Sequence, residues 1–342
     1  AAAALYVGSQ QGRLPAPFGP ARNGLISYEV SGDIYVGDPV TGNSRLVVGG
    51  IPNDDHDPGF SPDGTLIAFL RSADANNVDL YVVRPDGSDV KKVTAAAIPS
   101  GSWVSWAPDS RHIGVVHLEN GHKQLDVLGF DGQPARPLVT GMDIDSFSYR
   151  PPLGQEILFR AIADGHPGLF VMKADGTDIH QLVKTSTPAD YDEELNSATY
   201  SADGSRIFYQ RWFPDSIQLW AMNADGTDQH RFDTQVAPAW SGRAVLSPDG
   251  RWIAYWHVFE DGRATQRVSV VPSDGTGPLI QTGPELKGTT NFNWAPDSSK
   301  ILMVTSDAAD SPGYYLLDPA GGPWTKVAWQ ATSVPDWQRL AP

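Results

Sequence analysis

The chain has 342 residues, of which 40% are hydrophobic and 10% aromatic, a composition typical of a folded globular protein and not of a disordered chain. Lys and Arg number 25 against 40 Asp and Glu, so the formal net charge is −15, and a chain this acidic repels the phosphate backbone of nucleic acids. The absence of cysteine excludes disulfide scaffolds and thiolate chemistry, and no apolar run approaches the roughly 20 residues needed to span a bilayer.

Residues 1–23 precede the first regular pattern, and we predict that they form an N-terminal extension to a single domain of residues 24–342. The four alanines at the start are typical of a processed terminus or a cloning remnant. Three short runs rich in β-forming residues follow, at residues 25–28, 33–36 and 45–48, and each has the length and composition of a strand.

From residue 60 onward one short phrase recurs along the chain. An aromatic residue or Leu is followed by Ser or Ala, Pro or Ala, Asp, and Gly or Ser, and then by an apolar run that begins with Ile. The full copies have their Asp at Asp63, Asp109, Asp203, Asp249 and Asp297. A degenerate copy without the Asp reads Arg150-Pro151-Pro152-Leu153-Gly154.

A second phrase is an apolar run that ends in an Asp-Gly or similar turn, and its first Asp stands at positions 38, 86, 131, 175, 225, 274 and 318. Asp-Gly between apolar runs is typical of a hairpin turn, because Gly adopts positive φ at no steric cost and Asp accepts hydrogen bonds from the turn backbone. Each unit of about 45 residues therefore predicts four antiparallel strands, a to d, which together form one blade of a β-propeller.

The count of turns predicts how the ring closes. There are seven c–d turns but only six a–b turns, because the first unit has no strand a in front of it. Near the C-terminus, Trp337 stands where Trp106 and Trp294 stand at the end of strand a in other units. We therefore predict an all-β, seven-bladed propeller of four-stranded antiparallel blades, in which the C-terminal strand joins the N-terminal blade and removes the sheet edges that an open ring would expose.

The repeat resembles that of the TolB family of propellers. The resemblance rests on the phrase at residues 60–64, the apolar runs at 67–69 and 80–83 and the turn at 86–87, and it extends from about residue 24 to residue 340. It implies a propeller fold and a bacterial protein that works outside the cytoplasm, in the periplasm, at the cell surface or as a secreted protein. TolB itself carries a separate N-terminal domain and a six-bladed ring, whereas about 22 residues precede the first blade here.

In a propeller, the a–b and c–d turns lie on one face and the b–c and d–a connections lie on the other. The Asp residues of the turns are interpreted as structural, because each can accept hydrogen bonds within its own turn. The other connections are predicted to be long loops, including residues 117–122, 164–166 and 211–213 between strands b and c. Loops on a rigid scaffold carry function more often than the scaffold does.

Strand a lines the centre of the ring, so side chains at its start should face the axis. We predict a binding funnel from these positions and from a further Trp on the same face: Asp57, Trp103, Asp145, Glu194, Trp240, Arg243 and Asn291. Carboxylates, indoles, a guanidinium and an amide that converge in this way suit a polar ligand or a cationic loop of a partner. The alternative interpretation is a solvated acidic rim that holds no ligand.

Few motifs in the chain indicate a metal or a nucleophile. Asp54, Asp55 and Asp57 could supply oxygen ligands to Ca²⁺, and no other cofactor is predicted. There is no G-x-S-x-G elbow of a hydrolase and no H-E-x-x-H metal motif. His117 and His122 are interpreted as surface histidines of a loop.

Two enzyme hypotheses stay open. Some seven-bladed propellers that this chain resembles are polysaccharide lyases that use His, Tyr and Arg with a metal, and the resemblance implies His56, Tyr191 and Arg243 for those roles. Their uronate substrates are anions, which an acidic funnel repels. A glycoside hydrolase would need two carboxylates among Asp57, Asp145 and Glu194. The first is disfavoured by charge and the second rests on the number of carboxylates alone, and we therefore favour a protein that is not an enzyme.

The function that these patterns favour is a non-catalytic binding or scaffold module outside the cytoplasm. Its partner would be a protein or peptide bound on the long-loop face, and a basic segment would suit the acidic funnel. One alternative is a carbohydrate-binding or carbohydrate-cleaving protein that uses the same funnel. Another is a structural component of a cell-surface assembly. Nucleic acid and a membrane span are not expected.

Overall fold

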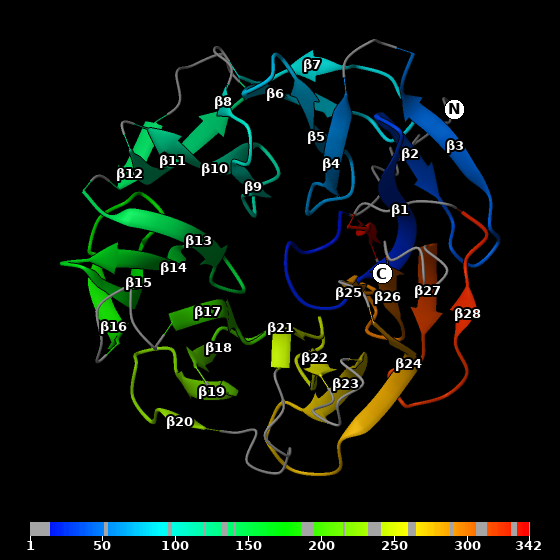
Figure 1. Cartoon of the computed structure of the whole chain (residues 1–342). Coiled ribbons are helices and arrows are strands. Elements are labelled where there is room, and N and C mark those ends of the chain that lie inside the picture. The colour runs from blue at the N-terminus through cyan, green and yellow to red at the C-terminus, as the bar shows by residue number, and fades with distance from the viewer. Residues whose placement is uncertain are drawn as a thin grey trace, which may run out of the picture.

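The structure is a computed structural model that describes residues 14–50, 54–94, 98–119, 121–130, 136–139, 141–185, 194–214, 216–231, 241–258, 265–287, 290–305, 313–329 and 334–341. Within these ranges all regular secondary structure is β-strand. The same ranges contain no helix that is long and apolar enough to cross a membrane. The strands form seven antiparallel sheets around one axis, and the first strand of each sheet lies nearest the centre (Figure 1). The predicted seven-bladed, all-β propeller is therefore confirmed.

Each blade has four strands, and one blade has a fifth. The first blade consists of β29 (Asp336–Leu340), β1 (Arg22–Val30), β2 (Asp33–Gly37) and β3 (Ser44–Val48). The second consists of β4 (Asp55–Phe60), β5 (Ile67–Ser72), β6 (Asn77–Val83), β7 (Lys91–Lys92) and the added β8 (Ile98–Pro99). The third consists of β9 (Trp103–Trp106), β10 (His112–Glu119), β11 (His122–Gly129) and β12 (Arg136–Val139).

The remaining four blades follow in chain order and complete the ring. They are formed by β13 (Asp143–Tyr149), β14 (Glu156–Ala163), β15 (His166–Lys173) and β16 (His180–Lys184); by β17 (Glu194–Tyr200), β18 (Arg206–Phe213), β19 (Ser216–Asn223) and β20 (His230–Arg231); by β21 (Ser241–Leu246), β22 (Trp252–Val258), β23 (Gln266–Pro272) and β24 (Ile280–Leu286); and by β25 (Thr290–Trp294), β26 (Ile301–Thr305), β27 (Gly313–Leu317) and β28 (Thr325–Lys326).

The C-terminal strand closes the ring, as predicted. β29 pairs antiparallel with β1, and Trp337 lies opposite Ile26. The register is the same in the third blade, where Trp106 lies opposite Ile113. Trp337 is buried, so the last strand contributes to the core and does not merely cover it.

The hydrophobic core of the described residues is divided into seven clusters, each between two neighbouring blades. The cluster between the last and the first blade contains Ile26, Tyr28, Trp329 and Trp337. In it, the rings of Tyr28 and Trp329 stack with their centroids 4.9 Å apart. The interface that closes the ring is thus packed in the same way as those between blades that are continuous in sequence.

One face of the ring, which we call the turn face, carries the Pro-Asp-Gly turns at residues 61–64, 107–110, 201–204, 247–250 and 295–298. In the first of these, Asp63 accepts hydrogen bonds from the backbone N–H of Thr65 at 3.0 Å and from the hydroxyl of Ser61 at 2.7 Å. Asp203 accepts the equivalent pair from Ser205 and Ser201. The interpretation of these carboxylates as structural is confirmed by their contacts.

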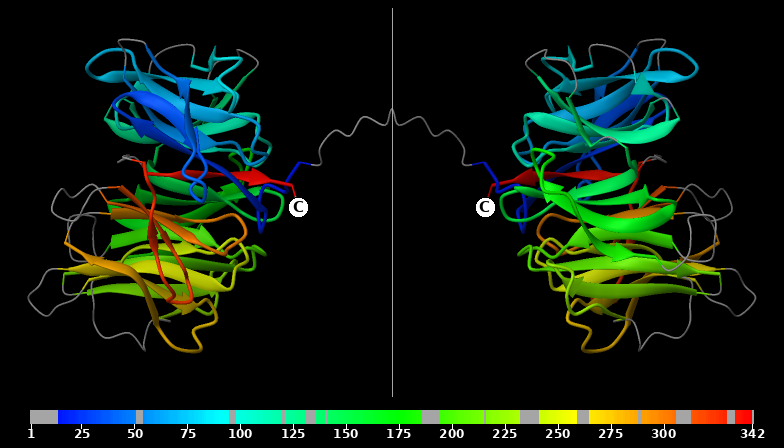
Figure 2. Two further views of the ribbon diagram at one scale, coloured as in Figure 1. Left: turned by 90° about the vertical axis from the view of Figure 1, so that its right-hand side faces the viewer. Right: turned by 90° about the vertical axis from the view of Figure 1, so that its left-hand side faces the viewer.

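Residues 14–21 of the predicted extension lie across the turn face. Arg339 of β29 donates hydrogen bonds to the carbonyl oxygens of Ala16 and Gly19, at 3.1 and 2.6 Å. The N–H of Ala21 donates to the carbonyl of Pro296 at 3.0 Å. Figure 2 shows this segment and the C-terminus on the same side of the ring. β1 begins at Arg22, and the division of the chain at residue 23 stays a prediction.

Several connections that we predicted as long loops are tight hairpins. β10 continues to Glu119 and β11 begins at His122, so residues 117–119 belong to a strand. β14 and β15 meet at Asp164 and Gly165, both with positive φ. The prediction of long loops at 117–122, 164–166 and 211–213 is therefore wrong, because strands b and c pair without interruption up to their connecting turns.

Candidate functional site

The face opposite the turns, which we call the loop face, is where the innermost strands β4, β9, β13, β17, β21 and β25 begin. The predicted funnel residues fall near these strand starts, but their side chains differ in exposure and pairing. Trp103 is the first residue of β9, and 56% of its surface is exposed. An indole this exposed leaves a large apolar ring in contact with water, where it is available to a partner.

A small pocket of about 120 Å³ lies beside Trp103. It is bounded by the segment Pro99–Trp103, by Val116, His117 and Leu118 of β10, and by the side chains of Lys123 and Asp145. Trp103 and Asp145, predicted separately from the sequence, are thus brought into one pocket. Leu118 is 55% exposed, so an aliphatic and an aromatic side chain border the pocket on its solvent side.

Asp145 is engaged with cations from two neighbouring blades. Its carboxylate forms ion pairs with Lys123 of β11 and with Arg160 of β14, and the Arg160 side chain is largely buried. Next to it, Asp143 accepts a hydrogen bond from the backbone N–H of Lys123 at 3.0 Å. Asp145 therefore joins the third blade to the fourth, and its role in binding a ligand stays a prediction.

His117 is a part of this site that the sequence analysis misjudged. Its Nε2 lies 3.1 Å from Oδ2 of Asp126, and both side chains are only 11% exposed. The other carboxylate oxygen of Asp126 is buried and has no hydrogen-bond partner among the described residues. No local sequence signal marked this pairing, because it depends on the register of β10 with β11. His122 is exposed, as predicted, with its Nδ1 3.2 Å from Asp143.

The acidic run at the start of β4 is also largely paired within the chain. Asp55 is buried and binds Arg71 through both oxygens, at 2.6 and 2.8 Å, and the guanidinium stacks on the ring of Tyr81 at 4.7 Å. Asp57 has a positive φ of 52° and lies 3.0 Å from Nδ1 of His56. This hydrogen bond raises the pKa of His56 above its ordinary value, against the opposing effect of burial.

These contacts bear on the predicted calcium ligands. Asp55 is committed to Arg71 and Asp57 to His56, whereas the side chain of Asp54 makes no hydrogen bond or ion pair with another described residue. The described part of the chain contains no group of three or more His, Asp or Glu side chains arranged to hold a metal ion. The calcium site stays a prediction that rests on Asp54, Asp55 and Asp57.

The other predicted funnel residues are less fully placed. Asn291 lies on β25 opposite Val304 and is half-buried. Glu194 and Arg243 belong to β17 and β21, and their side chains lie outside what the structure describes. Trp240, and Tyr191 of the lyase hypothesis, lie outside the described residues altogether.

A second indole on the loop face belongs to the fifth blade. Trp212, near the end of β18, is 37% exposed, and its Nε1 donates to Oε1 of Gln210 at 3.3 Å. It lies opposite Glu194 in the sheet register. The loop face therefore exposes large apolar side chains on two blades, at Trp103 with Leu118 and at Trp212.

Comparison with known proteins places this geometry among the propellers. No family model matches the sequence. An uncharacterized protein of Agrobacterium fabrum is 23% identical over 222 residues, which cover 61% of this chain and 71% of that protein. The crystal structure of TolB from Acinetobacter baumannii superimposes with a TM-score of 0.58 at 17% identity, over 92% of this chain and 81% of TolB. The chain folds as a TolB-like β-propeller.

The same propeller occurs in enzymes. An oligogalacturonate lyase, solved in complex with manganese, superimposes with a TM-score of 0.66 at 14% identity, over 92% of this chain and 86% of the lyase. Such low identity establishes the shared fold alone, because one fold supports many unrelated activities. The function has to be argued from the side chains of this TolB-like propeller.

Proposed function

We propose that this TolB-like propeller is a non-catalytic binding module outside the cytoplasm, and that a protein or peptide partner docks on its loop face at Trp103. The observation that carries the proposal is the exposed indole of Trp103 beside a pocket of about 120 Å³. Exposed aromatic side chains next to a concave pocket are typical of the few residues that dominate the energy of protein interfaces. The location outside the cytoplasm rests on the likeness to TolB.

The size of the pocket supports a side chain as its occupant. A cavity of about 150 Å³ accommodates a benzene ring, so 120 Å³ has room for one aliphatic side chain or a proline ring but not for a whole sugar chain. Val116 and Leu118 supply apolar contacts, and Trp103 can cover the inserted group. At the edge of the pocket, Lys123 can donate hydrogen bonds to backbone carbonyls of the partner, and Asp145 can accept them from its N–H groups.

Charge contributes to the proposal at longer range. The chain carries a formal charge of −15, which accelerates the approach of a basic partner at low salt. At the site itself Asp57 and Asp145 are already paired with His56, Lys123 and Arg160, so local carboxylates add less than the sequence predicts. The partner is thus steered by net charge and anchored by apolar contact.

A carbohydrate ligand is the second candidate, and Trp103 is also the observation that favours it. An indole face stacks on the apolar face of a sugar ring as readily as on a side chain. In that case the sugar would lie on Trp103 outside the pocket. A structural component of a cell-surface assembly is the third, and it would use the same exposed apolar side chains against a fixed neighbour.

The test is a random-peptide phage library panned on the purified chain, followed by dissociation constants for the selected peptides. Trp103→Ala should weaken binding by about tenfold or more, the effect of losing an interface anchor. Trp324→Ala is the matched control, because Trp324 is 44% exposed on the seventh blade, away from the site. It should change the constant by less than about twofold.

The library also distinguishes the alternatives. Peptides that bind equally well to Trp103→Ala would contradict the site, and a library that yields no peptide tighter than about 100 µM would contradict a peptide partner. Selection of basic sequences whose association slows with salt would establish the steering by charge. Repeating the titration in calcium and in EDTA tests the predicted ion at Asp54, Asp55 and Asp57.

A further inference from the structure

The turn of the fourth blade departs from the repeat. Between Tyr149 and Ile157, which pair across the turn, there are seven residues, 150–156, whereas the fifth blade has six, 201–206, between Tyr200 and Ile207. Where the other turns have an Asp that accepts hydrogen bonds from its own turn, this turn has Leu153, which is 69% exposed. A local departure in an otherwise regular face is where a function separate from folding can be sought.

Arg150 replaces the Ser or Ala that begins the other turns, and it ties the altered turn to the ring. Its Nε donates to the carbonyl of Gly204 in the next turn at 2.8 Å, and its Nη1 pairs with both oxygens of Glu156, at 3.1 and 3.2 Å. Glu156 also accepts a hydrogen bond from the hydroxyl of Tyr200 at 2.7 Å. The altered turn is therefore held in place by a defined network.

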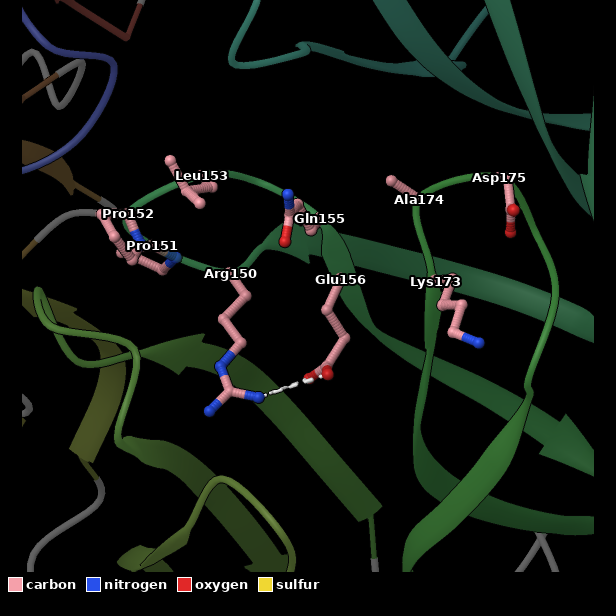
Figure 3. Close-up of a pocket in the computed structure, with 9 residues that line it drawn as sticks. All are labelled: Arg150, Pro151, Pro152, Leu153, Gln155, Glu156, Lys173, Ala174 and Asp175. Atoms are coloured by element: carbon pink, nitrogen blue, oxygen red, sulfur yellow. Dashed lines mark hydrogen bonds and ion pairs between the residues drawn. The ribbon is translucent and has the colours of Figure 1, made fainter.

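Beside this turn is a pocket of about 660 Å³, more than five times the volume of the one at Trp103 (Figure 3). Its volume lies within the range of about 300–1,000 Å³ typical of small-molecule sites. Pro151, Pro152 and Leu153 form one side, and Lys173, Ala174 and Asp175 of the neighbouring c–d turn form the other. Arg150, Gln155 and Glu156 lie between the two sides.

The charged groups of the pocket are already paired. Arg150 binds Glu156, Lys173 lies 3.3 Å from Asp178, and Asp175 accepts hydrogen bonds from the N–H and the hydroxyl of Thr177. A charged ligand would have to break one of these pairs. A neutral ligand would not, and it could still use the remaining N–H donors and carboxylate lone pairs.

The polar groups that remain are of both kinds. The amide of Gln155 has no side-chain partner among the described residues, and it offers both a donor and an acceptor. Lys173 and the outer N–H groups of Arg150 are donors, and the carboxylate of Glu156 is an acceptor. The hydroxyl groups of a sugar can both donate and accept hydrogen bonds, so they suit such a mixed set of polar groups. The apolar side of the pocket at Pro152 and Leu153 matches the C–H face of a sugar ring.

We propose that this pocket is a second binding site, on the turn face, for a neutral oligosaccharide. The ring would lie against Pro152 and Leu153, and its hydroxyls would reach Gln155, Lys173 and Glu156. The site is on the opposite face from Trp103, so it neither requires nor excludes a peptide partner on the loop face.

The experiment is isothermal titration of the purified full chain with maltotriose, cellotriose, triacetylchitotriose and, as the charged probe, trigalacturonate. At least one neutral trisaccharide should bind tighter than about 1 mM, a usual affinity for a small polar site. The double variant Gln155→Ala/Lys173→Ala should weaken this binding by about tenfold or more. The matched control Ser205→Ala/Asn223→Ala alters the equivalent positions of the fifth blade and should bind as the unaltered chain does.

Three results would overturn the proposal: binding of none of the neutral sugars, binding of trigalacturonate alone, or equal binding by the pocket variant and its control. Loss of sugar binding in Trp103→Ala but not in Gln155→Ala/Lys173→Ala would place the sugar on the loop face and overturn it too. The melting curve of the pocket variant should match that of the unaltered chain, because its two altered side chains are exposed. The control also loses hydrogen bonds of Ser205 and Asn223 within its turn, so it should melt slightly lower and still bind the sugar.

Discussion

The two faces of the ring use the same residue types for different purposes. On the turn face, Asp63, Asp203 and their equivalents direct their carboxylates into their own turns, and the pattern is repeated from blade to blade. On the loop face, Asp55, Asp57 and Asp145 each have a different partner, and the exposed Trp103 has no equivalent in the repeat. What recurs from blade to blade serves folding, and what occurs in one blade is where binding should be sought.

The largest expected effect comes from breaking the ring on which both faces depend. Deleting residues 334–342 removes β29 and with it the buried Trp337. A buried Trp alone contributes about 3–5 kcal/mol, so the melting temperature should fall by roughly 10 °C or more. Calorimetry measures this, with Trp324→Ala as a control that should cost less than about 1 kcal/mol. A melting curve that does not move would contradict closure by the C-terminal strand.

The next effect tests whether a loop-face carboxylate can be structural. Asp55 and Arg71 form a buried, doubly hydrogen-bonded pair. Asp55→Asn or Arg71→Met alone should cost about 3–5 kcal/mol in denaturant unfolding, because each leaves a charge buried without its partner. The double replacement Asp55→Leu/Arg71→Met should cost less than either. Single variants that lose under about 1 kcal/mol would contradict a structural role for this pair.

A pH-dependent effect distinguishes Asp336 of the closing strand from the turn carboxylates. Burial raises the pKa of Asp336 to about 6, although the N–H of Phe60 donates to it at 2.6 Å. The unfolded chain releases this proton near pH 4, so stability should fall as pH rises from about 4 to 6. The side chain is partly accessible to water, which screens its charge, so the loss is at most about 3 kcal/mol.

Asp336→Asn isolates this effect. The amide oxygen can still accept the hydrogen bond from Phe60, and no charge forms as pH rises. Relative to the unaltered chain, the variant should therefore gain stability between pH 4 and pH 7. Asp109 and Asp249 should change the stability with pH in the opposite direction. Hydrogen bonds lower their pKa, despite the opposing effect of burial, so they stabilise the fold above pH 4. A constant difference between the two pH curves would contradict the raised pKa.

The smallest effect is the difference in stability lost when one residue is replaced in each of two turns of the turn face. Asp63→Ala removes a carboxylate that accepts three hydrogen bonds, from the Ser61 hydroxyl and from the N–H and hydroxyl of Thr65. It should cost about 1–2 kcal/mol in unfolding free energy. Leu153→Ala, in the turn without the Asp, should cost under about 0.5 kcal/mol because the side chain is exposed. Equal costs would show that the turn carboxylates contribute little.

Much of the fold could be predicted from the sequence, because turn chemistry is local. Pro, Asp and Gly impose their backbone angles within four residues, so their spacing revealed the blades, and the count of turns revealed how the ring closes. The extent of the strands was predicted less well. The continuation of β10 through His117 to Glu119 depends on pairing with β11 and on packing between blades, not on turn residues.

The sequence by itself determined the blade number, the closing strand and the residue types at the start of each innermost strand. Only the tertiary structure decided which of those residues are paired within the chain. Asp145 is paired because Lys123 and Arg160 approach it from two blades, and Asp55 because Arg71 lies beside it in the sheet. Such contacts join residues from different strands and blades, and their energy depends on burial and distance, which no short stretch of sequence encodes.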